Sequence, residues 1–236
     1  VILNGENADD SGVGITKKIF EEFLESGADV ITTGNHVWDQ KETMEFITKE
    51  SRLLRPANLV QGSPGNGMGI YISKSKKRVA VLNLMGNVFM KKSENVFEEA
   101  KKFIKKIQLG TEADFIVVDM HGEITSEKMA MGHLFDGKVT MVVGTHTHVP
   151  TSDYRIMEKG TAYQTDIGMC GDYNSVIGMN KDNSIKKFLK DDTAKKHYPA
   201  LGEATISGLM VEADNKTGLA KKIQPIIVGN ILENRI

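Results

Sequence analysis

The sequence has a single cysteine, Cys170, among its 236 residues. One cysteine excludes an internal disulfide framework and fits a protein of the reducing cytoplasm, and we expect Cys170 to be buried and inert. No apolar run approaches the roughly 20 residues that a membrane span needs. No signal peptide or basic targeting leader is recognisable either. We therefore expect a cytoplasmic protein with no membrane partner.

The chain also lacks an excess of either charge. It has 30 Lys and Arg against 31 Asp and Glu, which gives a formal net charge of −1. Such a balance provides no broad positive field, so we expect no stable binding to nucleic acid. Internal repeats and low-complexity segments are absent as well. At this length nothing requires a second domain, and residues 1–236 are expected to form one domain.

Strand-like and helical patterns alternate along the first half of the chain, which indicates an α/β fold. Apolar runs of strand length are followed by stretches with helical spacing, of which 94–108 is the clearest. Residues 204–213 and 219–228 instead predict a hairpin, so we expect mixed sheets. The remaining predicted strands are 1–3, 29–33, 69–73, 78–82, 114–118, 139–143 and 161–164, and the remaining helices 16–26, 40–49, 126–135 and a short basic one at 185–189.

The most informative stretch is Val-Val-Gly-Thr-His-Thr-His-Val-Pro, residues 142–150. A buried strand is expected to end at Gly144, and two histidines follow at a spacing of two. In extended backbone this spacing places His146 and His148 on one face, because side chains alternate with period two. Two neutral imidazoles aimed at one point favour a metal site.

Residues able to bind a metal follow four of the predicted strands. In open α/β sheets, sites form beyond the carboxyl ends of the strands, so these residues should converge. The set has no thiolate, which favours iron, manganese or zinc in a catalytic role. Two such ions bridged by a glutamate suit phosphate ester hydrolysis. The residues are Glu6 and Asn7 after the first strand, Asn35 and His36 after the second, His121 after the third, and His146 and His148 after the fourth.

Each of these residues also has an interpretation without a metal. His36 could be a loop histidine that caps a helix, and Asn35 could stabilise a left-handed turn. Glu6 could be a surface acid near a helix, and His121 a hydrogen-bonded core histidine. Their joint position at strand ends favours the metal site.

The motifs resemble those of the calcineurin-like metallophosphoesterases, and most closely the YmdB-like bacterial 2′,3′-cyclic-nucleotide phosphodiesterases. The resemblance covers nearly the whole chain. Its motifs are Asn-Gly-Glu-Asn (4–7), Gly-Asn-His (34–36), Leu-Arg-Pro-Ala-Asn (54–58), Asp-x-His-Gly-Glu (119–123), Gly-Thr-His-Thr-His (144–148) and Gly-Thr-Ala-Tyr-Gln-Thr-Asp-Ile-Gly-Met (160–169).

The resemblance implies a sandwich of two mixed β-sheets flanked by helices. It also implies a phosphodiesterase that holds two metal ions, divalent or of mixed valence, with iron or manganese favoured and zinc open. The implied substrate is a cyclic nucleotide, 2′,3′- or 3′,5′-linked, hydrolysed to a nucleoside monophosphate by a metal-activated hydroxide. A homo-oligomer is suggested by the family alone.

The resemblance also implies a role for each site residue. Glu6 would bridge the two ions, with His148 on one of them. His36 would protonate the leaving alkoxide, and Asn7 would be a hydrogen-bonding neighbour or an added ligand. The implied ligands of the other ion are Asn35, His121 and His146.

One departure from the family pattern keeps an alternative open. Family members begin with a strand ending in Gly-Asp-Val, whose aspartate binds the ion that His148 would bind, and no such segment precedes Val1. We expect that this N-terminal strand is missing from the chain. The alternative is a regulatory protein that binds a cyclic nucleotide or a partner through a degraded metal site. A metal-dependent amidohydrolase is disfavoured, because its barrel needs eight strand–helix units.

Overall fold

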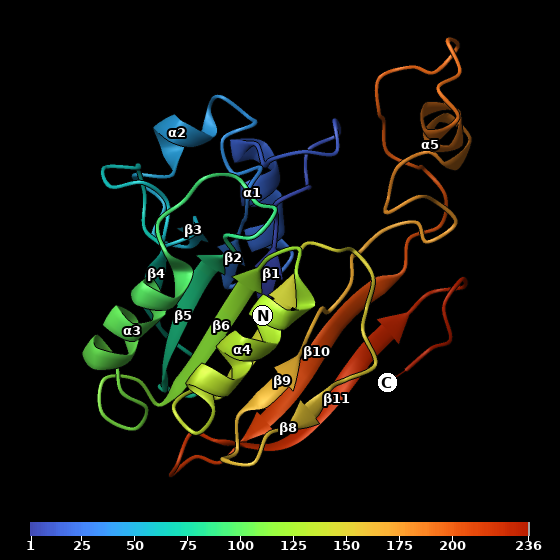
Figure 1. Ribbon diagram of the computed structural model, residues 1–236. Coiled ribbons are helices and arrows are strands. Elements are labelled where there is room, and N and C mark those ends of the chain that lie inside the picture. The colour runs from blue at the N-terminus through green and yellow to red at the C-terminus, as the bar shows by residue number, and fades with distance from the viewer. Residues whose placement is uncertain (236) are drawn as a thin grey trace.

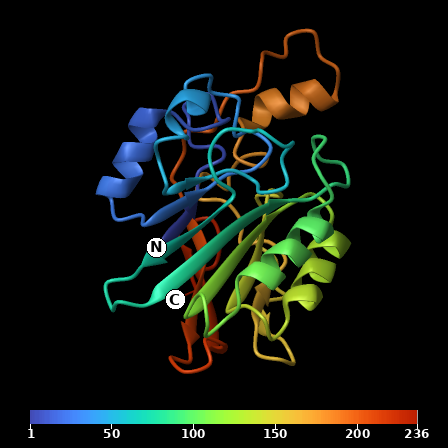
Figure 2. The same cartoon turned by 90° about the vertical axis from the view of Figure 1, so that its left-hand side faces the viewer.

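The computed structural model describes residues 1–235 and arranges them in four layers: helix, sheet, sheet and helix. One sheet is parallel, with the order β1 (Ile2–Asn4), β2 (Val30–Thr32) and β3 (Leu53–Leu54). Helix α1 lies outside it, and α3 and α4 lie outside the second sheet, as Figure 2 shows. The second sheet has the order β4-β5-β6-β7-β9-β8. Its strands are β4 (Met68–Ile72), β5 (Arg78–Met85), β6 (Phe115–His121), β7 (Met141–Thr145), β9 (Ala162–Gln164) and β8 (Arg155–Ile156), and the helices are α1 (Lys17–Glu25), α2 (Thr43–Phe46), α3 (Val96–Lys106), α4 (Thr125–Phe135) and α5 (Lys181–Phe188).

Alternation along the strands assigns each side chain to a layer. In β2, Ile31 belongs to the core that contains Phe20 of α1, whereas its neighbour Val30 packs with Val81 of β5. Successive side chains of a strand point to opposite faces. Each sheet therefore buries one face against helices and the other against the second sheet.

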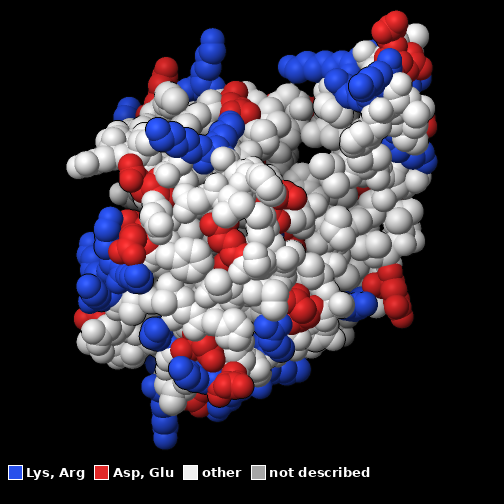
Figure 3. All heavy atoms as spheres, viewed as in Figure 1, with Lys and Arg blue, Asp and Glu red and all other residues white. Residues whose placement is uncertain are grey.

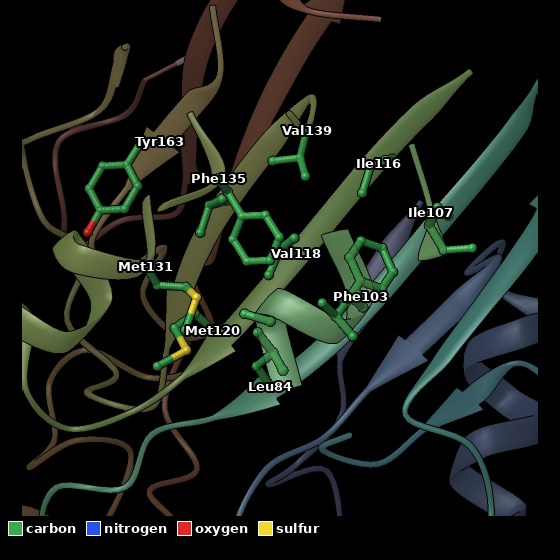
Figure 4. Packing of buried hydrophobic residues seen from close by; sticks show 14 of the residues in the cluster. Leu84, Phe103, Ile107, Ile116, Val118, Met120, Met131, Phe135, Val139 and Tyr163 are labelled. Carbon is green, nitrogen blue, oxygen red and sulfur yellow. The ribbon is translucent and has the colours of Figure 1, made fainter. Parts of the chain in front are cut away.

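The largest core cluster lies between the six-stranded sheet and helices α3 and α4 (Figure 4). Phe103 of α3 and Phe135 of α4 meet edge to face, with ring centroids 6.3 Å apart. Val118 and Met120, two residues apart on β6, belong to the same cluster. Helix α3 begins after Asn95, whose side chain accepts two backbone N–H groups of the first turn.

The C-terminal part forms an antiparallel hairpin of β10 (Ile206–Ala213) and β11 (Ala220–Val228). Between β9 and β10 the chain leaves the sheets, and residues 165–205 contain turns and helix α5. Figure 1 shows this orange segment at the end of the molecule toward which the arrowheads of β5 and β6 point. Two of its residues, Ile177 and Met179, line a cleft together with His36, His146 and His148.

The α/β class and the helix-flanked sheets are confirmed, with the hairpin as a third hydrogen-bonded sheet. Some local expectations were wrong. Strand β7 continues through Gly144 to Thr145, because this glycine pairs with Met120 of β6. Helix α5 begins at Lys181, four residues before the expected start. Cys170 is exposed rather than buried, because it lies in the loop between β9 and β10.

Charged side chains of both signs are interspersed on the face that Figure 3 shows. This distribution agrees with the near balance of acidic and basic residues in the sequence. Across residues 1–235, no helix combines the length and the apolar character needed to cross a bilayer.

Candidate metal centre

Three of the expected site residues surround one ring nitrogen of a fourth, His121. Nε2 of His121 lies 2.6 Å from Oε2 of Glu6, 3.0 Å from Oδ1 of Asn35 and 3.0 Å from Nδ1 of His146. Glu6 and His121 are buried, each with 1% of its surface exposed. Glu6, His121 and His146 each offer one ligand atom, and these atoms lie within 4.8 Å of one another. We call these four residues the Glu6 cluster.

The strand ends bring the cluster together. Asp119 of β6 connects the two sheets at this end, because its buried carboxylate accepts hydrogen bonds from Asn4 Nδ2 at 2.9 Å and Thr32 Oγ1 at 2.5 Å. Burial raises the pKa of this Asp119 carboxyl. The cluster residues are Glu6, two positions after β1; Asn35, three after β2; His121, the last residue of β6; and His146, directly after β7.

The Gly-Asn-His motif has a steric reason. A Cβ atom at Gly34 would lie 2.3 Å from the ring of His121 and 2.6 Å from Oε1 of Glu6. Only glycine allows the loop after β2 to approach so closely. The backbone N–H of His36 then donates to Oε1 of Glu6 at 2.7 Å, which fixes the carboxylate.

Burial and neighbouring charges set the protonation states of the cluster. Burial, with a contribution from His121, lowers the pKa of His146 to about 4, so its imidazole is neutral at pH 7. Burial also acts to lower the pKa of His121, but the carboxylates of Glu6 and Asp119 outweigh it and the pKa is raised. Burial acts to raise the pKa of Glu6, yet His121 and His36 hold it below its usual value.

The donor set fits a metal ion. The Thr145 hydroxyl donates to Asp119 Oδ1 at 2.7 Å and so accepts from Nδ1–H of His121 at 3.0 Å. Nε2 of a neutral His121 then carries a lone pair, and the oxygens of Glu6 and Asn35 beside it are acceptors. Acceptors that meet in this way can bind one metal ion, which would displace the Nε2 proton of the metal-free protein. Two ligand atoms at about 2.1 Å from one ion and at right angles lie about 3.0 Å apart, close to the separations observed.

His36 lies beside the cluster. Its Nδ1 is 2.6 Å from Oδ2 of Asp39, whose other oxygen is 3.2 Å from Nζ of Lys91. Partial burial acts to raise the pKa of Asp39, but these two contacts hold it below its usual value. The ionised carboxylate accepts the Nδ1 proton, which leaves Nε2 of His36 available for proton transfer.

His148 and Asn7 are outside the cluster. They line a cleft beside it, together with His36 and His146. Nδ1 of His148 lies 2.7 Å from the carbonyl oxygen of Ile177, and Asn7 Nδ2 donates to the carbonyl of Gly12 at 2.8 Å. The expectation of extended backbone was wrong, because φ is +105° at His146 and +65° at His148. The backbone turns here, and the two imidazoles have different neighbours. Their assignment to two different ions stays a prediction.

The cleft beside the cluster has a volume of about 320 Å³, within the roughly 300–1,000 Å³ of small-molecule sites. Its polar lining includes His36, Glu123 and His146, with Glu123 Oε2 3.1 Å from Nε2 of His146. Its apolar lining consists of Val13, Ile177 and Met179.

Two alternatives to a metal site fail here. Glu6 is buried rather than a surface acid, and Asn35 is not among the residues with a positive φ. Two residues that support the site, Asp39 and Asp166, were not predicted from the sequence. Asp39 follows His36 at a spacing of three, a weak signal. Asp166 accepts the N–H of Thr147 at 3.0 Å, a contact that no sequence pattern indicates.

The four layers and the buried imidazole–carboxylate cluster define a metallophosphoesterase-type protein, and solved structures share the fold. A hypothetical protein from Thermus thermophilus superposes with a TM-score of 0.88 at 33% identity, over 97% of this chain and 86% of that one. A novel phosphatase from Mycoplasma pneumoniae gives a TM-score of 0.87 at 36% identity, over 97% and 81%.

Sequence comparison gives the family. Residues 1–226 match the profile of the YmdB-like protein family, and the chain belongs to this family. A relative from Bacillus subtilis, named 2′,3′-cyclic-nucleotide 2′-phosphodiesterase, is 43% identical over 229 residues, which cover 97% of this chain and 85% of the relative. The expected family and the expected enzyme class, a hydrolase of phosphoric diesters, are confirmed.

Proposed function

We propose that this chain hydrolyses 2′,3′-cyclic nucleotides with the help of metal ions at the Glu6 cluster. The observation that carries the proposal is the convergence of Glu6, Asn35 and His146 on Nε2 of His121, beside a cleft that His36 lines. The name of the Bacillus subtilis relative supports this substrate class. A 3′,5′-cyclic nucleotide is the second substrate to test.

The cluster would hold one ion, and His148 with Glu6 would contribute to a second. Iron or manganese, divalent or of mixed valence, suits these ligands. Bound ions would supply Lewis acids for the phosphoryl oxygens and lower the pKa of a water molecule. The chain keeps its ligands ready for them, because burial holds His146 neutral and the His36 N–H fixes the Glu6 carboxylate.

His36 is the general acid of the proposal. Asp39 accepts the proton on Nδ1 of His36, so the ring is oriented and its Nε2 carries the transferable proton. As water attacks phosphorus and the bond to the leaving ribose oxygen breaks, Nε2–H protonates that oxygen. We further propose that the chain works as one domain, since both sheets contribute residues to the site.

The test is turnover of 2′,3′-cyclic AMP and 3′,5′-cyclic AMP with manganese, with iron under anaerobic conditions, and with chelator. We expect chelator-sensitive hydrolysis of the 2′,3′-cyclic substrate to a nucleoside monophosphate, identified by chromatography. Turnover of the 3′,5′-cyclic substrate alone would replace the substrate class. Tight metal binding without turnover of either would indicate another phosphoester. Absence of both would favour a regulatory binding protein.

A further inference from the structure

Residues 176–179 form a tight turn at the cleft. The backbones of Val176 and Met179 exchange two N–H···O bonds of 2.9 Å, so Ile177 and Gly178 form the tip. Their φ angles are +48° and +92°. A turn with positive φ at both central residues is of the I′ kind, which favours Asn, Asp or Gly at these positions. A β-branched residue such as Ile177 is strained there.

This turn meets the site in two ways. The carbonyl oxygen of Ile177 is 2.7 Å from Nδ1 of His148. A carbonyl can only accept, so Nδ1 carries the proton and Nε2 of a neutral His148 holds the lone pair. Ile177, 54% exposed, also lines the cleft together with Val13 and Met179. Any residue at position 177 would supply this main-chain carbonyl. The contact with His148 therefore does not explain why the residue is an isoleucine.

We propose that Ile177 is a specificity-determining residue, whose side chain, with Val13 and Met179, forms the apolar wall that receives the base of the cyclic nucleotide. This inference rests on the proposed function. Residues held in sparsely populated backbone conformations cluster at active sites and ligand-binding segments. An exposed isoleucine in an unfavourable turn position buries its apolar surface when the flat face of a base packs against it. The histidines of the same cleft suit the phosphodiester end of such a substrate.

The test replaces the side chain with one that the turn prefers. In Ile177→Asn the backbone strain falls, so the melting temperature should stay equal or rise by about 2–4 °C. The apolar contact is lost, and kcat/KM for 2′,3′-cyclic AMP should fall about ten-fold. We expect a higher KM with little change in kcat, because the contact is remote from the reacting bond.

A substrate without a base separates this role from a general effect on the site. On methyl riboside 2′,3′-cyclic phosphate, kcat/KM of Ile177→Asn should stay within about two-fold of the unsubstituted protein. Metal content should not change, because the partner of His148 is a main-chain carbonyl. Leu201→Asn is the matched control, since Leu201 is 96% exposed on the same segment and outside the cleft lining. It should leave all these quantities unchanged.

Three outcomes would overturn the inference. They are an unchanged kcat/KM on 2′,3′-cyclic AMP, an equal loss on both substrates, and a loss of metal with Ile177→Asn, which would make the turn a support for His148 only. Failure of the unsubstituted protein to hydrolyse either substrate would instead remove the proposed function.

Discussion

The orientation of the His36 ring depends on Asp39, a residue outside the Gly-Asn-His motif. Gly-Asn-His could be recognised from the sequence, whereas the contact between Nδ1 of His36 and Asp39 depends on how the loop after β2 turns. The same holds for Thr145, whose hydroxyl fixes which nitrogen of His121 faces the cluster. Residue types at strand ends can therefore be predicted. Their supporting hydrogen bonds depend on side-chain positions that no spacing encodes.

His36→Ala should lower kcat by roughly 10²–10⁴ with the metal content intact, because the substitution removes the proton donor and no atom of the cluster. Asp39→Asn should cause a smaller loss, since it leaves the imidazole in place but changes its orienting partner. Steady-state rates and elemental analysis on the same samples test both. Loss of metal along with activity in His36→Ala would reassign His36 as a ligand.

Gly34→Ala should abolish stable metal binding, since the added Cβ would collide with the ring of His121 and the carboxylate of Glu6. The measurement is metal stoichiometry after dialysis. Gly208→Ala is the control, because a Cβ there meets nothing within 4 Å and its φ is not positive. Equal stoichiometry in both variants would mean that the cluster does not hold the ion.

Among the helices and strands, those with long periodic patterns could be predicted from the sequence. Very short strands, and strand extensions that depend on pairing with a neighbour, could not. The apolar spacing of α3 and the runs of β6 and β7 identified these elements from the sequence. Strand β3 has two residues and β8 has two, too few for a period to show. The C-terminal extension of β5 to Met85 depends on pairing with β6, which brings Met85 opposite His121. Such pairing is non-local, so the sequence pattern does not reveal it.

A buried ion pair holds the His-x-His turn against the elements around it. Nζ of Lys128 on α4 is 2.8 Å from Oδ2 of Asp166, and both residues have 0% exposure. The same oxygen accepts the backbone N–H of Thr147, between the two histidines. The pair thus connects α4, the loop after β9 and the His-x-His turn.

Lys128→Met should lower the free energy of unfolding by about 3–5 kcal/mol, because it leaves the Asp166 carboxylate buried without its partner. Urea denaturation measures the change. The matched control is Lys222→Met, which removes an exposed pair with Glu212 at 3.4 Å and should cost less than about 1 kcal/mol. Similar midpoints for the two variants would contradict the structural role of the pair.

For the whole molecule, the site links the stability of the fold to pH. Glu6, whose pKa is held below its usual 4.5, stabilises the metal-free protein above that pH, and this contribution is lost as the pH falls through the lower native pKa. His121, whose pKa is raised above 6.5, contributes below pH 6.5 and loses this as the pH rises through the raised native pKa. The ion pair of Glu6 and His121 therefore stabilises the metal-free protein most between pH 4.5 and pH 6.5.

Metal binding should reverse the pH dependence of stability that His121 causes. A metal ion binds His121 in its neutral form and displaces the proton. We expect Mn²⁺ to raise the melting temperature of the chelated protein more at pH 8 than at pH 6. Thermal unfolding across this range, with and without Mn²⁺, measures the difference. A shift that does not depend on pH would contradict a role for His121 as a ligand.

We propose that the Glu6 cluster holds the metal that hydrolysis of 2′,3′-cyclic nucleotides requires. The most direct measurement is the initial rate on 2′,3′-cyclic AMP as Mn²⁺ is titrated into chelated protein, with His121→Asn compared at each concentration. We predict no turnover before addition, saturable recovery in the unsubstituted protein, and at least about a 10²-fold lower rate in a folded His121→Asn variant. Full turnover in chelator, or recovery of the variant with the same metal dependence, would contradict this role of the Glu6 cluster.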